Sequence, residues 1–330
     1  MAVFQKPAIT PAQQIELLKK RGLTILDEQR ALCFLEAVSF FRLTPYMRPF
    51  QHNNNAHLFK DGAKLSQITK LYDFDRRLRL LAIDAIERVE ISVRAKISNS
   101  LCTKYGPHWY LDKQYFKNNY NHQRLLQSIR DKQNTALEDY KRECIRIDKL
   151  QSSDLNYKAF LKQKRQQESY ARHYSLTYTK PELMPGWAML EELSLGELSH
   201  LYKGLAKDKD KKMIASGFEL YPPLLESWLH TLTVIRNICA HHSRLWNREL
   251  GIKPVHPTQK DFSWPGYLQS HTQHTRIATV LSILHHIMQR VSPDTNWHNH
   301  LLSLFKNFPE IPIKQMGLTE NWNEDEFWHE

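Results

Sequence analysis

One long amphipathic pattern constrains this chain more than any other feature of its sequence. Residues 71–101, LYDFDRRLRLLAIDAIERVEISVRAKISNSL, carry apolar side chains three to five positions apart. The stripe comprises Leu78, Leu81, Ile86, Val89, Val93 and Ile97. Because that spacing places the side chains on one side of an α-helix, the segment predicts a long helix with one buried face. Glu90 and Arg94, four residues apart, are expected to form an intrahelical ion pair beside it.

The rest of the chain also favours helices over strands. Only 10 of its 330 residues are glycine, about half the usual share, and apolar and polar residues rarely alternate over the length of a strand. Near the N-terminus, Thr10 and Pro11 fit the cap and first position of a helix. We therefore predict an all-α protein. FFRLTPYMRPF, within residues 39–50, is an expected exception, because a residue before proline, here Thr44, favours an extended conformation and hence a turn.

Changes in composition suggest an organisation along the chain. We predict an N-terminal helical region at 1–60 and a main helical domain at 61–330, with a charged helical insertion at about 121–180. The insertion has 13 basic and 7 acidic residues, so it is a candidate nucleic-acid arm. A solvated helix pair without a partner has the same composition, and the sequence leaves both open. The tail at 308–330 either packs through its large aromatic side chains or frays.

Overall charge and the cysteine pattern narrow the class of protein. The chain has 46 Lys and Arg against 35 Asp and Glu, a net charge of +11, which favours polyanionic partners such as RNA or DNA. Its four cysteines are far apart without a CxxC pair, as expected for reduced thiols. No secretory signal and no apolar run of about 18 residues is evident, so we expect a cytoplasmic protein without a membrane partner.

Histidines raise the question of a metal site. Pairs of histidines occur at 271/274, 285/286 and 298/300, but no Cys, Asp or Glu supplies an obvious third ligand nearby. The sequence also has no GxxxxGK[ST], GxGxxG or HExxH motif. We therefore expect neither a metal nor another cofactor.

The segment RNICAHHSRLWNREL, residues 236–250, combines polar and apolar side chains in an unusual way. At 100° per residue, one helix face holds Arg236, Asn237, Ala240, His241 and Arg244. The opposite face holds Ile235, Ile238, Cys239, His242, Leu245 and Trp246, and is expected to face the core. Since Asn and His are mediocre helix formers, a merely solvated face has little reason to use them. The alternative to a functional site is a buried polar network that fixes helix packing.

Cleavage of an RNA phosphodiester needs the residue types that this face offers. A base takes the proton from the 2′-hydroxyl, an acid protonates the departing 5′-oxygen, and a cation holds the phosphoryl oxygens. Histidine can do either proton transfer at neutral pH, and the guanidinium of arginine suits phosphate. Asn237 is four residues before His241, where it could orient the imidazole or donate to the phosphate. One helix supplies one such histidine, so a complete pair predicts two copies across a two-fold axis.

The arginine-to-histidine spacing resembles the R-x(4–6)-H signature of the HEPN superfamily. The whole segment 236–250 resembles the abortive-infection family of the AbiD/AbiF type, as do FFRLTPYMRPF, LYDFDRRLRLLAIDAIERVEISVR and MPGWAMLEELSLGELSHLY. The four blocks occur in order and cover most of residues 15–250. The resemblance implies a HEPN-like helical bundle, usually homodimeric, that acts as a metal-independent endoribonuclease in phage defence. The resemblance also makes a regulatory partner RNA or an antitoxin a candidate partner, because some systems of this kind include one.

Carried over to this chain, the resemblance assigns roles to individual residues. Arg236 would hold the phosphate, Asn237 would be the polar residue beside it, and His241 would be the acid or base. His242 also satisfies the family spacing, but the helical wheel turns it towards the core and so favours His241. The expected RNA-backbone contacts are His242, Arg244, Asn247 and Arg248. For His242 we favour a place in the core or behind the site over an RNA contact, whereas the other three could equally cap or bridge the end of the helix.

Two other classes of function fit the same sequence. One is a non-catalytic RNA-binding or regulatory dimer, in which the same face grips a structured RNA. The other is a protein-interaction module whose basic arm only aids solubility; RNA binding that is absent even at low salt would favour it.

Overall fold

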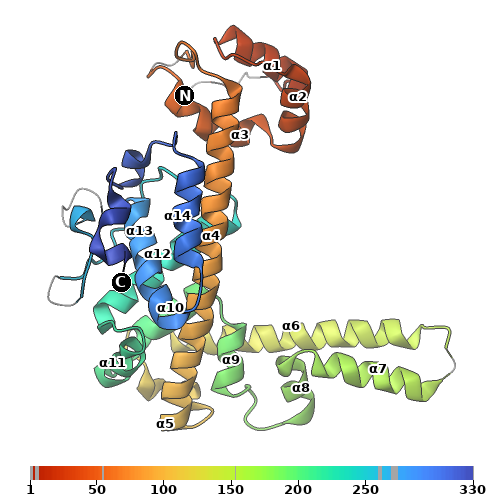
Figure 1. Ribbon diagram of the computed structural model, residues 1–330. Coiled ribbons are helices and arrows are strands. Elements are labelled where there is room, and N and C mark those ends of the chain that lie inside the picture. Colours follow the sequence, from red (N-terminus) through yellow and green to blue (C-terminus); the bar gives the residue numbers. More distant parts are fainter. Residues whose placement is uncertain are drawn as a thin grey trace.

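The computed structural model describes residues 3, 7–53, 56–152, 154–258, 262–268 and 274–329, and within these ranges every regular element is helical (Figure 1). The predicted all-α class is therefore confirmed. The α-helices are α1 (Pro11–Lys20), α2 (Glu28–Ala37), α3 (Phe40–Met47), α4 (Leu65–Ile97), α5 (Thr103–Tyr105), α6 (His122–Asp148), α7 (Leu155–Gln167), α8 (Tyr170–Thr177), α9 (Gly186–Glu192), α10 (Leu195–Gly204), α11 (Asp208–Ser216), α12 (Pro222–Ala240), α13 (Ile277–Val291) and α14 (Trp297–Asn307). A π-helical turn, Ser98–Cys102, and short 3₁₀ turns at Arg48–Phe50, Trp109–Leu111, Lys113–Tyr115, Gly266–Leu268, Ile313–Met316, Trp322–Glu324 and Glu326–Trp328 connect them.

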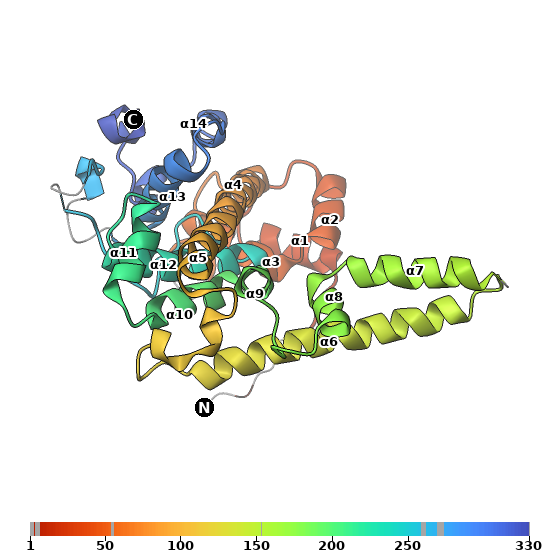
Figure 2. The same cartoon turned by 90° about the horizontal axis from the view of Figure 1, so that it is seen from below.

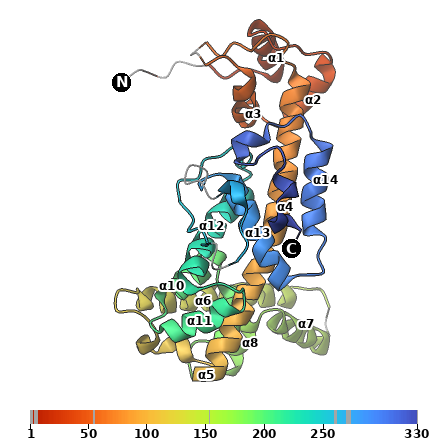
Figure 3. The ribbon, with the colours of Figure 1, turned by 60° about the vertical axis from the view of Figure 1, so that its left-hand side comes forward.

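Helix α4 is the axis around which the other helices pack. Its 33 residues make it about 50 Å long at 1.5 Å per residue. Helices α3, α12, α13 and α14 all contact it, and they lie along its length in Figures 1 and 3. The predicted apolar stripe is buried as expected, although the helix begins six residues earlier, at Leu65, and Leu81 is only half-buried.

The first helices form where their capping residues predict. The Thr10 hydroxyl accepts from the Gln13 amide while the Gln13 side chain accepts from the Thr10 amide, so the two residues form a capping box before α1. Asp27 caps α2 in a similar way. Both helices lie at the N-terminal end of α4 (Figure 3).

The turn predicted at 39–50 is wrong, because most of this segment is helical. Helix α3 contains Pro45, which lacks the amide that would donate within the helix. Three side chains of α3 are buried, Leu43, Tyr46 and Met47. Burying such side chains contributes about 1.5–3 kcal/mol each, which offsets the cost of about 3 kcal/mol for a proline inside a helix. Tertiary packing thus overrides the local preference of Thr44 and Pro45.

Helices α6 and α7 form an antiparallel hairpin, here called the arm, that projects across the direction of α4 (Figures 1 and 2). Helix α8 packs against its base, where Ile129 and Tyr174 are buried. Towards the tip, Leu155 and Phe160 are exposed. The arm falls within the predicted insertion at about 121–180, while the division into 1–60 and 61–330 stays a prediction.

The C-terminal part of the chain encloses α13. Every residue from Ile277 to Met288 is buried, so this helix is covered on all sides. Trp322, Phe327 and Trp328 are also buried, and the Trp328 indole donates to the Tyr267 hydroxyl at 3.1 Å. Of the two expectations for the tail, packing through its aromatic side chains is the one that the structure shows.

Candidate functional site

Helix α12 carries the first part of the segment 236–250 and ends inside it. The helix begins after Tyr221 with Pro222 at its first position, and its last residue is Ala240. We expected helical geometry to continue through Trp246, and that expectation is wrong. The remaining residues form turns and loop, so their positions cannot be taken from the helical wheel.

The paired histidines form the C-terminal cap of α12. His241 is the C-cap, and its amide donates to the Asn237 carbonyl at 3.0 Å. His242 has a left-handed backbone, with φ of 54°, and donates to Cys239. The Ser243 amide donates to the Ile238 carbonyl at 2.9 Å. These bonds make a Schellman motif, in which glycine normally occupies the left-handed position that His242 occupies here.

This cap decides which of the predicted site residues face solvent. Arg236, Asn237 and His241 are exposed, as the wheel predicted. His242 is exposed too, so the expectation that it points to the core is wrong. The reason is the left-handed turn, which redirects the chain one residue after the helix ends.

Leu245 and Trp246 are buried as expected, but an aspartate on α4 holds them rather than a continuing helix. The Oδ1 atom of Asp75 accepts from the Leu245 amide at 3.1 Å and from the Trp246 amide at 2.5 Å. The Tyr46 hydroxyl donates to the same carboxylate at 2.5 Å, and the Arg79 guanidinium forms a buried ion pair with it. Burial raises the pKa of Asp75, whereas these four donors oppose the shift by stabilising the charged form.

The Asp75 network joins three segments that are far apart in the sequence. It connects α3 through Tyr46, α4 through Asp75, and the loop after α12. A second contact ties α3 to the same loop, because the Arg42 guanidinium donates to the His242 carbonyl at 2.7 Å. Sequence reasoning missed this network; the only local signal is an Asp and an Arg four residues apart on the buried side of α4.

Five arginines gather around the end of α12, and we call them the arginine surface. They are Arg42, Arg48, Arg236, Arg244 and Arg248. Within the described ranges, none of them forms an ion pair with a carboxylate. Arg244 is half-buried, and burial lowers its pKa; Asp75 opposes this shift, while the nearby Arg248 and Arg48 add to it. Of the five, Arg42 and Arg48 were not predicted as site residues.

The other expected RNA contacts are placed less favourably. The Asn247 side chain donates to the Gln315 side chain at 3.0 Å, so it is already engaged with the C-terminal part of the chain. Arg248 donates to the Arg244 carbonyl at 3.5 Å, which bridges the loop after the helix.

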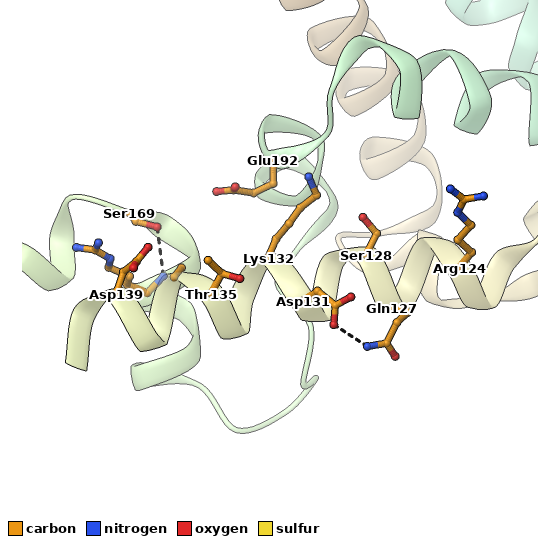
Figure 4. A pocket seen from close by; sticks show the side chains of 11 residues that line it. Arg124, Gln127, Ser128, Asp131, Lys132, Thr135, Asp139, Ser169 and Glu192 are labelled. Carbon is orange, nitrogen blue, oxygen red and sulfur yellow. Dashed lines mark hydrogen bonds between the residues drawn. The ribbon is translucent and has the colours of Figure 1, made fainter. Parts of the chain in front are cut away.

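Several charges on the arm are paired, although its basic residues still outnumber its acidic ones. Its ion pairs include Arg130–Glu182, Arg142–Asp139, Lys162–Asp148, Arg165–Glu168 and Arg172–Glu143. A groove of about 720 Å³ runs along α6, and its lining mixes both signs, with Lys132, Asp131, Asp139 and Glu192 in view (Figure 4). These paired charges attract a polyanion less than the arginine surface does, whereas the arm as a whole keeps a positive surplus.

The predicted pair Glu90–Arg94 is confirmed, and its role is in the packing of α9. The Arg94 guanidinium contacts the Glu90 carboxylate and also donates to the carbonyls of Leu190 at 3.0 Å and Leu193 at 2.9 Å. Both carbonyls lie at the end of α9; the Leu190 carbonyl also accepts from the Leu193 amide, and Arg94 gives the Leu193 carbonyl a partner that the helix does not supply.

The described residues contain no group of three or more His, Cys, Asp or Glu side chains that could hold a metal ion. Of the histidine pairs in the sequence, His285 and His286 are buried in α13, and His271 lies outside the described residues. No described helix is long and apolar enough to cross a bilayer.

The sequence matches a known protein family over about two thirds of its length. The family model for Abi-like proteins matches residues 33–247. The chain belongs to the Abi-like protein family. The matched region runs from α2 to the loop after α12, so it includes Tyr46, Asp75 and the whole arginine-to-histidine motif of this Abi-like chain. Membership links the chain to abortive infection, a form of phage defence. No curated protein and no solved structure matches it significantly.

Proposed function

We propose that this Abi-like chain is a metal-independent endoribonuclease of the HEPN type that acts in the cytoplasm during abortive infection. One observation carries the proposal: Arg236, Asn237 and His241 are exposed together at the end of α12, among arginines that have no carboxylate partner in the part of the chain that the structure describes. Guanidinium groups bind phosphoryl oxygens through two parallel N–H donors, so an RNA phosphate is the ligand that this surface favours.

In the proposed reaction, the 2′-hydroxyl attacks the adjacent phosphorus and the bond to the 5′-oxygen breaks. His241 moves one of the two protons, either from the 2′-hydroxyl or to the departing 5′-oxygen. Arg236 holds the phosphoryl oxygens as negative charge builds, and Asn237 orients the imidazole or donates to the phosphate. The products are a 2′,3′-cyclic phosphate and a 5′-hydroxyl.

We also propose that the active form is a homodimer. His241 moves only one of the two protons, and we assign the second to His241 of a second copy rather than to the neighbouring His242, which is also exposed. A regulatory RNA or an antitoxin would bind the same arginine surface and restrain the enzyme. Full activity in a monomer would contradict the composite site.

Cleavage of labelled RNA by three variants tests the assignment. We expect His241→Ala and Arg236→Ala to lower the rate by about 100-fold or more, the range in which general acid–base catalysis contributes. His242→Gly is the matched control, because glycine keeps the left-handed cap and removes only the imidazole. At saturating RNA, where the loss of one RNA-backbone contact no longer limits the rate, it should cleave at the wild-type rate, with or without EDTA.

Wild-type cleavage by both His241→Ala and Arg236→Ala would overturn the proposal. Loss of activity in His242→Gly with activity retained in His241→Ala would transfer the proton role to His242.

The second candidate is a non-catalytic RNA-binding dimer, which the arginine surface would also serve. The two candidates differ in the outcome for His241→Ala. A catalytic site loses turnover and keeps its RNA affinity, whereas a binding site loses affinity and shows no turnover in the wild type either.

A further inference from the structure

A groove of about 550 Å³ lies between α10 and α12, and we call it the α10–α12 groove. Helix α10 contributes His200 and Lys203, and α12 contributes Glu226, His230 and Thr233. Nothing in the motif 236–250 or in the Asp75 network uses these side chains.

The groove and the motif lie on the same side of α12. Glu226, His230, Thr233 and Asn237 are four, three and four residues apart, a spacing that aligns them along one helix face. At 1.5 Å per residue, His230 is about 9 Å from Arg236 along the axis. Stacked nucleotides advance about 3.4 Å each, so that distance corresponds to two or three nucleotides.

The walls of the groove are held in place. The Trp228 indole donates to the Val255 carbonyl at 2.9 Å, and the Val255 amide donates to the Ser227 hydroxyl at 2.8 Å. On the other side, a Cβ atom at Gly196 would lie 3.2 Å from the Thr233 methyl group, so α10 and α12 already approach closely there. A rigid groove binds a ligand without first losing conformational freedom.

Its charge suits a polyanion. The single carboxylate of the lining, Glu226, contacts Lys203 in the groove at 3.8 Å and the buried Lys211, outside the lining, at 2.9 Å, so two ammonium groups share one negative charge. The imidazoles of His200 and His230 are exposed, and His230 has no hydrogen-bond partner among the residues that the structure describes. With the apolar side chain of Val255, the groove offers donors for phosphate or ribose and flat surfaces for a base.

We infer that the α10–α12 groove binds single-stranded RNA, two or three nucleotides from the phosphate held by Arg236. A single strand fits because its bases can turn into a narrow groove, whereas those of a duplex are paired and stacked. The spacing of two or three nucleotides rests on the proposed function, because it assumes that Arg236 holds the phosphate that is cleaved. It assigns His200 and His230 a binding role rather than a catalytic one.

Binding of an uncleavable RNA tests this. The probe is a fluorescent single strand of about 12 nucleotides with 2′-O-methyl ribose, and anisotropy at roughly 100 mM salt reports its Kd. The double variant His200→Ala/His230→Ala changes two exposed side chains and should fold normally. We expect its Kd to rise about tenfold, the scale of one lost base-stacking contact. His300→Ala, an exposed histidine of α14, is the control and should change Kd by about twofold or less.

The readouts separate this inference from the proposed function. An unchanged Kd in the double variant overturns the groove as an RNA site, even if cleavage of ordinary RNA depends on Arg236. Altered self-association with unchanged RNA affinity also overturns it, in favour of a second copy in the groove. A raised Kd together with cleavage that does not need Arg236 supports RNA binding in the groove and contradicts the proposed function alone.

Discussion

Removing the Asp75 carboxylate is expected to destabilise this chain severely, although Asp75 lies outside the exposed site. Asp75 is fully buried and accepts from Tyr46, Arg79 and two backbone amides. The substitution Asp75→Ala therefore leaves a guanidinium and two amide groups without their acceptor. Arg79 is only 5% exposed, so water cannot easily replace the lost carboxylate.

The size of the effect follows from these contacts. Breaking a buried ion pair by removing one partner costs about 3–5 kcal/mol. Each buried amide that loses its acceptor costs a further 1–3 kcal/mol, roughly, unless the loop moves to reach water. We expect Asp75→Ala to lower the free energy of unfolding by about 4 kcal/mol or more, a large part of the roughly 5–15 kcal/mol typical of a folded protein. Asp75→Asn keeps one carbonyl acceptor, so its free energy of unfolding should lie between those of Asp75→Ala and the wild type.

Urea denaturation followed by circular dichroism measures this, and α4 itself supplies the control. Asp73 and Arg77 form an ion pair with the same four-residue spacing on the same helix, but at its exposed side, with Nε and Oδ2 3.0 Å apart. Exposed pairs contribute about 0–1 kcal/mol, so Asp73→Ala should change stability little. If Asp75→Ala unfolds at the same urea concentration as Asp73→Ala, the role given to the network is refuted.

Three further predictions follow from the packing. Gly204→Ala should lower the melting temperature and cost about 1–3 kcal/mol, because its Cβ would lie 2.2 Å from a ring atom of Tyr120; an unchanged melting curve would contradict this. Burial lowers the pKa of His285 and of His286 to about 3, so between pH 6.5 and 3 the unfolded chain binds protons that the native chain does not. Each of the two histidines should therefore lower stability by about 1.4 kcal/mol per pH unit as the pH decreases, and His286→Phe should reduce the total slope by about that amount in urea titrations across this range. Arg94→Met should destabilise by about 2–3 kcal/mol, since it strands a half-buried carboxylate and the Leu193 carbonyl at the end of α9; a loss below about 0.5 kcal/mol would show that water replaces the guanidinium.

Rules that use only neighbouring residues were sufficient to predict much of the fold from the sequence. The stripe of α4 follows from apolar spacing, and the starts of α1 and α12 follow from Thr10, Pro11 and Pro222. In each case, the information lies within a few residues of the element that it specifies. The exposure of Arg236 and His241 was predictable for the same reason, since it depends only on where the buried face of α12 lies.

Features set by distant contacts could not be predicted. Pro45 favours a turn locally, yet α3 forms because its apolar side chains meet α4. The end of α12 is marked by no glycine, because His242 occupies the left-handed position that a glycine usually occupies. That backbone is stabilised by a bond from Arg42, 200 residues away in the sequence. A helical wheel has no means of representing such a contact.

The Asp75 network gives the segment after α12 an unusual dependence on α4. Asp75 binds backbone amides of Leu245 and Trp246 rather than their side chains, so the path of this loop is fixed independently of what those side chains are. Apolar substitutions there that keep the volume should leave His241 in place, whereas loss of the carboxylate releases the loop. The buried carboxylate of Asp75 thus helps to fix the position of the exposed His241. It follows that the two halves of the motif are held differently: Arg236 by the helix that carries it, and His241 by its own cap bond to that helix together with the anchored chain that follows it.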